Sequence, residues 1–390
     1  MYRSLSVLLV AQVFAQCAAP MVVLLGGIVG ADLAPTIDLA TLPVALMIVG
    51  TALTTIPAAL LMGRVGRKKG FIFGACYAIL AGLLAAYAIS ERDFPLFCVA
   101  TLLIGSHNAF IQQYRFAAAE SVPADKVGPT LSILMLAGVV AAYIGPETAQ
   151  SMRHSVDWGD FSGSFLALSG FLTCTLLALC FYPDSKLVNE TSTENQRPLL
   201  EIIGQSRFIL AVGASAIGFA VMSFVMTATP VSMHTVDHHS LDDTTWVIQS
   251  HIMAMFLPSL FSGVLIAKLG APKVISTGLA LIVSCLVIAY VDQQLMHYWW
   301  ALVLLGVGWN FLFLGGTTLL TQTYRTSERF KVQAFNDFLV FTPQAIAALS
   351  SGLVLSQLGW NWILALSLPW LIVLIPLIYN GTRPVAVPNA

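Results

Sequence analysis

Long apolar stretches alternate with short polar connections along the whole chain. A helix needs about 20 apolar residues to cross the hydrocarbon core of a bilayer, and twelve stretches come close to that length. They cover residues 5–30, 40–62, 70–89, 95–118, 128–149, 162–182, 207–231, 245–267, 273–291, 298–322, 333–357 and 360–380. This pattern predicts an all-α integral membrane protein with twelve transmembrane helices.

One connection is longer than the others and divides the spans into six and six. Residues 183–206 carry the polar run SKLVNETSTENQRP near their centre, which is typical of a linker. The sequence therefore predicts an N-terminal six-helix half over residues 1–182, a linker over 183–206 and a C-terminal six-helix half over 207–390.

The composition agrees with a chain whose surface is covered by lipid. Hydrophobic residues make up 57% of the 390 residues and charged residues 9%, whereas an average soluble domain carries about 25% charged residues. The formal net charge of −1 gives no reason to expect a nucleic-acid partner. The first apolar run is too long for the core of a signal peptide, so we interpret it as an uncleaved span.

Basic residues are distributed unevenly between the two sides of the predicted bundle. Of the 18 Lys and Arg residues, 15 fall on the side of the N-terminus, Arg92 and Arg153 fall on the other side, and Arg115 lies within a span. Because cytoplasmic loops carry an excess of Lys and Arg, both termini are predicted to be cytoplasmic in a protein of the cell inner membrane. Six tryptophans lie at the opposite boundary, as in an aromatic belt.

The two halves share an internal repeat. The end of the second span and the end of the eighth align at an offset of 204 residues, which pairs Arg64 with Lys268 and Gly66 with Gly270. Two homologous six-helix halves are a known transporter design, in which the substrate site lies near the midplane between them.

The loop after the second span carries a family resemblance. The stretch Ala59–Lys69, ALLMGRVGRKK, resembles the loop signature of the major facilitator superfamily, usually written GxLaDRxGRK. The matching residues are Arg64, Gly66, Arg67 and Lys68. The resemblance implies a secondary transporter that works by alternating access. The stretches at 308–316 and 335–338 also resemble a branch of bacterial facilitators, from which no substrate carries over.

The resemblance also implies a cytoplasmic gate. In the family, the loop arginine pairs with an acidic residue at the end of the fourth span, and Glu120 occupies that place here. The expected gate residues are therefore Arg64, Arg67 and Glu120. Gly63 stands where the family has aspartate and Ala59 where it has the first glycine, so part of the family's charge relay is missing.

The direction of transport stays open at this stage. The fifth span, from Gly138 to Pro146, is similar to the Gly-Pro signature of family antiporters, which favours export. The double glycine that usually follows is replaced by Ala149-Gln150, and the fourth-span arginine of drug antiporters is absent near residues 100–101. Uptake of an anionic metabolite, with Arg115 as its cation, is the alternative.

Polar side chains inside the spans are the candidates for a substrate cavity, because such groups are costly in lipid and usually face the bundle interior. In the fourth span, Thr101, Gly105, Asn108, Gln112 and Arg115 recur at spacings of 4, 3, 4 and 3 residues on one helical face. The resemblance implies that the first, fourth, seventh and tenth spans line the cavity. The candidates are Gln12, Gln16, Asn108, Gln112, Arg115, Ser223, Thr227, Asn310 and Thr317. They suit a small polar or amphipathic organic solute, and ordinary hydrogen bonding between helices is the alternative.

Two carboxylates are candidates for proton coupling. Asp337 lies at a depth similar to that of Arg115 and is its expected partner, as a gate or substrate clamp, although a permanent ion pair, or one with Glu120, is also open. Glu147 lies near the outer end of the fifth span, where it is either a protonation site or simply interfacial. His107 and His251 lie within spans, where a lone histidine usually serves packing.

The remaining motifs set the functional class. No Walker A, HExxH or GxSxG sequence occurs, so neither an enzyme nor an ATP-driven pump is indicated, and no cofactor is expected. The outer loop with His234, His238 and His239 matches no standard metal site. The sequence predicts a monomeric secondary transporter of a small molecule in the lipid bilayer, and the family resemblance implies that it is coupled to protons. A transporter-derived sensor without flux is the alternative.

Overall fold

The computed structural model describes residues 2–36, 39–123, 126–183 and 197–381, and every regular element in these ranges is helical. Twelve of its helical segments are long and apolar enough to cross a membrane, as the sequence predicts. The N-terminal helices are α1 (Tyr2–Gln16), α2 (Ala18–Leu33), α3 (Leu42–Val65), α4 (Arg67–Ser90), α5 (Phe94–Glu120), α6 (Val127–Ser151) and α7 (Ser162–Cys180). The C-terminal helices are α8 (Leu199–Ile203), α9 (Ser206–Val231), α10 (Leu241–Phe256), α11 (Ser259–Leu269), α12 (Ala271–Val291), α13 (Leu295–Leu320), α14 (Arg329–Leu358) and α15 (Trp360–Gly381). A π-helical turn, Ser232–Val236, extends α9, and a 3₁₀ turn, Thr326–Glu328, precedes α14.

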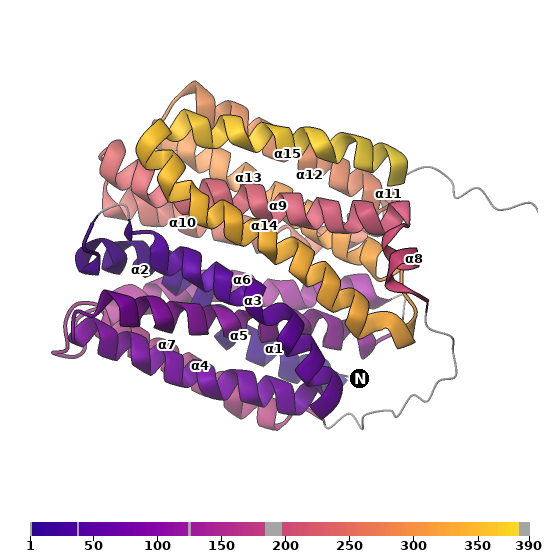
Figure 1. Ribbon diagram of the computed structural model, residues 1–390, viewed down its shortest axis with the longest axis horizontal. Helices are drawn as coiled ribbons and strands as arrows, with labels where there is room; N and C mark the ends of the chain where they lie inside the picture. Colours follow the sequence, from indigo (N-terminus) through magenta and orange to yellow (C-terminus); the bar gives the residue numbers. More distant parts are fainter. Residues whose placement is uncertain (1, 37–38, 124–125, 184–196, 382–390) are drawn as a thin grey trace, which may run out of the picture.

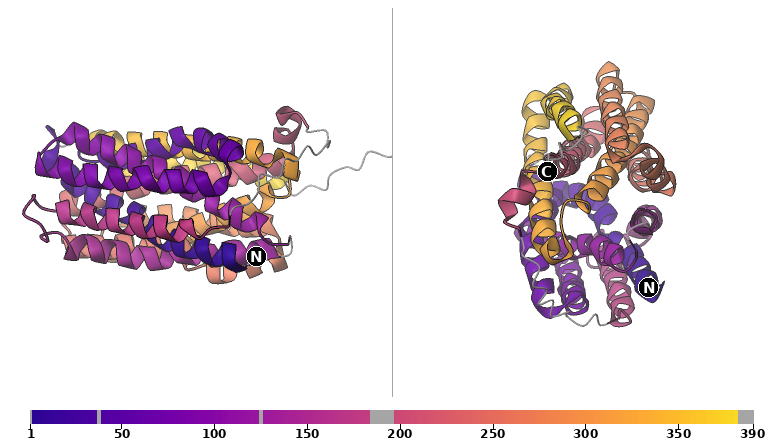
Figure 2. Two further views of the ribbon diagram at one scale, coloured as in Figure 1. Left: turned by 90° about the horizontal axis from the view of Figure 1, so that it is seen from below. Right: turned by 90° about the vertical axis from the view of Figure 1, so that its right-hand side faces the viewer.

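The helices run roughly side by side along the long axis of the molecule (Figure 1). Viewed along the helices, the earlier and the later parts of the chain form two neighbouring groups (Figure 2, right). We call the end where α1 begins and α15 ends the terminal end, and the opposite end the distal end. Most of the expected linker, residues 184–196, lies outside the described residues, and α8 follows it at the terminal end.

Two of the predicted spans are broken, and proline accounts for both breaks. The first span divides at Cys17 into α1 and α2. Pro20, in the first turn of α2, has no N–H for the Gln16 carbonyl. The eighth span divides at Leu257-Pro258 into α10 and α11, where Pro258 has no N–H for the carbonyl four residues before it. Apolar length alone predicts each as one continuous helix.

The repeat reappears in the way helices approach one another. Gly105 of α5 lies against the backbone oxygen of Met47 on α3, and Gly306 of α13 lies against the backbone oxygen of His251 on α10. Met47 and His251 are 204 residues apart, and the two glycines are 201 apart. A side chain at either glycine would overlap the facing backbone. Small residues let membrane helices pack this closely, so both halves use the same crossing.

We expect Gly105→Ala to destabilise the protein, because the new Cβ would collide with the Met47 carbonyl and force α3 and α5 apart. Overpacking of this kind costs about 1–3 kcal/mol. Thermal unfolding of the purified protein in detergent, followed by tryptophan fluorescence, measures the loss. Gly170→Ala on α7 is the matched control, since nothing lies within 4 Å of its added Cβ. Equal melting temperatures for the two variants would contradict this account of the crossing.

Candidate functional site

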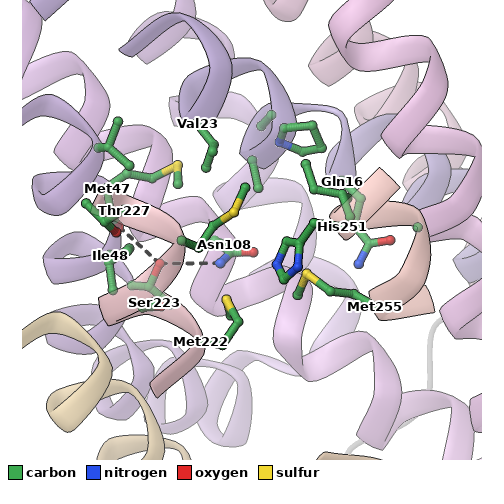
Figure 3. Close-up of a pocket in the computed structure, with 18 of the residues that line it drawn as sticks. Gln16, Val23, Met47, Ile48, Asn108, Met222, Ser223, Thr227, His251 and Met255 are labelled. Atoms are coloured by element: carbon green, nitrogen blue, oxygen red, sulfur yellow. Dashed lines mark hydrogen bonds between the residues drawn. The ribbon is translucent and has the colours of Figure 1, made fainter. Parts of the chain in front are cut away.

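A cavity of about 450 Å³ lies between the two halves and is lined by residues of both. At the distal end it reaches Ala31, Thr41 and His234, and toward the terminal end it stops at Arg115. Figure 3 shows side chains from α1, α5, α9 and α10 around this space. The cavity is thus approached from the distal end and closed toward the terminal end.

Most of the polar residues singled out from the sequence border this cavity. Thr51 of α3 also lines it and was missed, because a single threonine in an apolar span gives no periodic signal. Its hydroxyl donates to the Gly105 carbonyl oxygen at 2.9 Å, and Asn108 Nδ2 lies 3.4 Å from the same hydroxyl. The expected residues that line the cavity are Gln12, Gln16, Asn108, Gln112, Arg115, Ser223, Thr227 and Thr317. Their role in substrate binding stays a prediction.

Asn310 is the exception, since it does not line the cavity. Its amide nitrogen donates to the Met255 carbonyl oxygen at 2.7 Å and to Ser259 Oγ at 2.8 Å, and its amide oxygen accepts from Ser262 Oγ at 2.7 Å. These partners lie on both sides of the break between α10 and α11. Expecting Asn310 in the cavity was therefore wrong, because the broken helix beside it uses its hydrogen-bonding capacity.

Four aromatic rings of the C-terminal half form a wall that borders the same cavity as the polar residues of α1 and α5. Phe219 of α9 is its centre, with ring centroids 5.0 Å from Trp309, 5.2 Å from Phe313 and 5.2 Å from Phe341. All four rings line the cavity. This wall is not predictable from the sequence, because its members come from three helices, α9, α13 and α14, and ordinary apolar spans contain similar residues.

The cavity is closed toward the terminal end by an ion pair that joins the two halves. Arg115 Nη2 of α5 donates to Asp337 Oδ1 of α14 at 2.5 Å, and the Asp337 side chain is completely buried. Gln113 and Asn336 donate to the same carboxylate at 3.1 and 2.9 Å. The Arg115 guanidinium also lies 4.7 Å from the ring centroid of Phe313. Of the partners considered for Arg115, the structure thus selects Asp337.

A second ion pair lies beyond the first, at the terminal end. Arg67 at the start of α4 pairs with Glu120 at the end of α5, with Nη2 and Oε1 2.6 Å apart. The Arg67 guanidinium lies 5.1 Å from the ring centroid of Phe330 on the C-terminal half. Arg329 of that half approaches Glu120 to 4.0 Å. Of the expected gate residues, Arg67 and Glu120 are together, whereas Arg64 is exposed and has no ion pair among the described residues.

A third ion pair fixes the C-terminal end of the linker. Arg197 donates through its backbone N–H, Nε and Nη2 to the carboxylate of Glu328, whose side chain is 1% exposed. These bonds lower the pKa of Glu328 to about 2, with the Arg197 side chain as the main cause. Because the pKa is lowered, the pair stabilises the fold at neutral pH and loses that contribution only as pH falls toward 2. Nothing along the sequence indicates this pairing.

Of the other titratable candidates, His251 lines the cavity, whereas Glu147 and His107 lie apart from it. Glu147 is exposed on α6 and does not line the cavity. His107 is buried beside Tyr77 of α4, with ring centroids 6.4 Å apart, and is also outside the cavity lining. His251 does line the cavity. Within the described residues, no group of three or more His, Cys, Asp or Glu side chains is arranged to hold a metal ion.

The chain matches the family model described as Major Facilitator Superfamily over residues 7–313 and again over 216–390. It is 39% identical to the riboflavin transporter RfnT of Brucella anthropi over 380 residues, covering 96% of this chain and 95% of that protein. It is 30% identical to the uncharacterized MFS-type transporter YddS of Bacillus subtilis, covering 92% of this chain and 86% of that protein. The crystal structure of the human organic anion transporter MFSD10 matches 98% of this chain and 99% of its own, with a TM-score of 0.78 at 12% identity, and so supports the fold.

We expect Asp337→Leu alone to destabilise the protein strongly, because it leaves the Arg115 charge buried without its partner. Removing one member of a buried pair costs about 3–5 kcal/mol, whereas replacing both members with apolar residues is often close to neutral. The double variant Arg115→Leu/Asp337→Leu should therefore melt above the Asp337→Leu single variant in detergent. The single variant Arg115→Leu completes the comparison. If the double variant lost as much stability as the sum of the losses in the two single variants, the two side chains would not be energetically coupled.

Proposed function

This chain belongs to the major facilitator superfamily and is a secondary transporter that spans the membrane twelve times, and we propose that its substrate is a flavin, riboflavin in the first place. The family membership also makes it a transporter rather than an enzyme, as the sequence analysis expects. The observation that carries the substrate proposal is the 39% identity to a riboflavin transporter along 96% of the chain. The chemistry of the cavity supports it independently.

The size and lining of the cavity suit a flat aromatic solute. A volume of about 450 Å³ falls within the 300–1,000 Å³ of ordinary small-molecule sites. The rings of Phe219, Trp309, Phe313 and Phe341 offer stacking surfaces for a planar ring system. On the opposite wall, Gln12, Gln16, Asn108 and Gln112 supply amide groups for the hydroxyls of a ribityl chain.

The charge of the cavity favours an uncharged molecule over an anion. Among the described residues that line the cavity, Arg115 is the only Lys, Arg, Asp or Glu, and Asp337 already neutralises it. Riboflavin is neutral near pH 7, whereas its phosphate ester carries charge that would have to lose its hydration without a free cation to meet it. An anionic substrate is therefore less favoured than a neutral flavin.

The transport cycle we propose alternates between two states of the ion-pair layer. With the positive-inside orientation, the terminal end is cytoplasmic, so the described state is closed to the cytoplasm and open to the outside. The opposite state requires Arg115 and Asp337 to separate as residues 1–182 and 207–390 rock about the cavity. The sequence favoured export through its partial Gly-Pro signature. We propose uptake instead, because that signature is incomplete and the fourth-span arginine of drug antiporters is absent.

Proton coupling at Asp337 follows from the same step. A carboxylate that loses its arginine partner inside the protein is costly as an anion, and binding a proton removes that charge. Asp337 is the buried carboxylate between the halves, whereas Glu147 is exposed and remote from the cavity. We therefore assign the coupling proton to Asp337 alone.

We expect cells that require riboflavin and lack their own riboflavin uptake to accumulate it when they express this protein. Accumulation is followed with radiolabelled riboflavin and by growth at low riboflavin, with an empty vector as control. Unlabelled riboflavin should compete at least about tenfold better than flavin mononucleotide, since the cavity has no free cation for the phosphate. Phe219→Ala, which removes the centre of the aromatic wall, should raise the KM.

Three outcomes would contradict the proposal in different ways. Riboflavin binding to the purified protein without flux in proteoliposomes under any gradient would indicate a sensor. Flux that only empties preloaded cells would indicate export. Equal competition by riboflavin and its phosphate would argue against a site chosen for a neutral solute.

We expect Asp337→Asn to abolish riboflavin accumulation driven by a pH gradient in proteoliposomes, while exchange of riboflavin across the membrane continues. The amide still accepts a hydrogen bond from Arg115 but carries no counter-charge and cannot bind and release the coupling proton, so the variant is compared with the wild type at equal amounts of folded, reconstituted protein. Glu147→Gln is the matched control and should accumulate riboflavin as the wild type does. Full pH-driven accumulation by the Asp337 variant would place the coupling proton elsewhere.

A further inference from the structure

His251 is held in one tautomer by a bond to the neighbouring helix. Its Nδ1 lies 2.7 Å from the backbone oxygen of Leu302 on α13. A carbonyl oxygen can only accept, so Nδ1 carries the hydrogen and donates it. In the neutral imidazole the other ring nitrogen, Nε2, then presents a lone pair and acts as an acceptor.

The position of this acceptor is also fixed. The backbone of His251 lies against Gly306, one turn beyond Leu302 on the same helix, and a Cβ at Gly306 would overlap the His251 carbonyl oxygen. The ring is completely buried and cannot turn over without losing its bond to Leu302. A close helix crossing and a hydrogen bond therefore hold one acceptor at one place.

No described protein group bonds to His251 Nε2, although the residue lines the cavity. Leaving a buried acceptor unbonded costs free energy, so a packing role explains only the Nδ1 side of the ring. The amides of Gln16 and Asn108 border the same space (Figure 3). Trp309 Nε1, a donor that also lines the cavity, is likewise unbonded to the described protein.

Resting on the flavin substrate proposed above, we propose that His251 Nε2 accepts the imide N–H of the isoalloxazine ring and thereby determines which ring systems are carried. The polar edge of this ring presents one N–H between two carbonyl oxygens. It requires one acceptor flanked by donors. His251 supplies the acceptor, and the amide nitrogens of Gln16 and Asn108 supply donors for the carbonyl oxygens. The recognised class is a planar aromatic imide with a free N–H.

The test compares riboflavin with its N3-methyl derivative, which lacks that hydrogen. In the wild type, transport of riboflavin should be preferred at least about tenfold in kcat/KM, because a site built to bond an N–H rejects an analogue without it. In His251→Asn the preference should fall to near one. The asparagine amide can still donate to Leu302 but does not reach the Nε2 position. His251→Gln, whose amide oxygen can replace Nε2, should retain part of the preference.

Met255→Leu is the control, since Met255 lines the same cavity one turn along α10 and has no strong acceptor. It should leave the preference unchanged. A purely structural role of His251 would lower transport of both compounds equally in His251→Asn, and that unchanged ratio would overturn the inference. Equal transport of both compounds by the wild type would also overturn it, without need of any variant. Absence of riboflavin transport by the wild type would instead defeat the proposed function.

Discussion

A guanidinium buried inside a membrane protein needs a counter-charge, and Arg115 finds its counter-charge on the other half of the molecule. The bond to Asp337 joins α5 to α14, closes the cavity toward the terminal end and removes the net charge that Arg115 would otherwise bring to it. Gln113 and Asn336 complete the carboxylate's hydrogen bonds. Since the attraction between such charges is strong where water is excluded, separating them has to be compensated in any transport cycle. This links the closure of the cavity to our proposal of a neutral substrate.

The two halves share a backbone design but have diverged in side-chain chemistry. The Gly105–Met47 and Gly306–His251 crossings are equivalent in the repeat, yet one places a thioether beside the cavity and the other an imidazole. Amide side chains are concentrated on α1 and α5, and the aromatic wall belongs to α9, α13 and α14. The N-terminal half thereby contributes most of the amide groups of the cavity and the C-terminal half its aromatic wall. That combination suits a flat ring system with a polar edge.

The broken spans show how irregular backbone is accommodated at membrane depth. Such backbone is tolerated where protein covers it or where it lines a cavity. At the break between α10 and α11, Asn310 bonds to groups on both sides and so replaces part of the interrupted helix. At the break between α1 and α2, Gln16 and Ala18 border the cavity. Both irregularities therefore lie in places where polar backbone has partners or access to the cavity.

The sequence by itself determined the twelve spans, their predicted sidedness and the repeat, because apolar length, the placement of charges and internal similarity are readable along the chain. It also indicated the pairing of Arg115 with Asp337, since two opposite charges at similar depth have few other choices. Only the tertiary structure decided that Asn310 serves a helix break, that Glu147 faces away from the cavity and that Phe219 centres an aromatic wall. It also fixed the His251 tautomer. These features depend on which face of each helix meets which neighbour, and the spacing of residues along one helix does not contain that information.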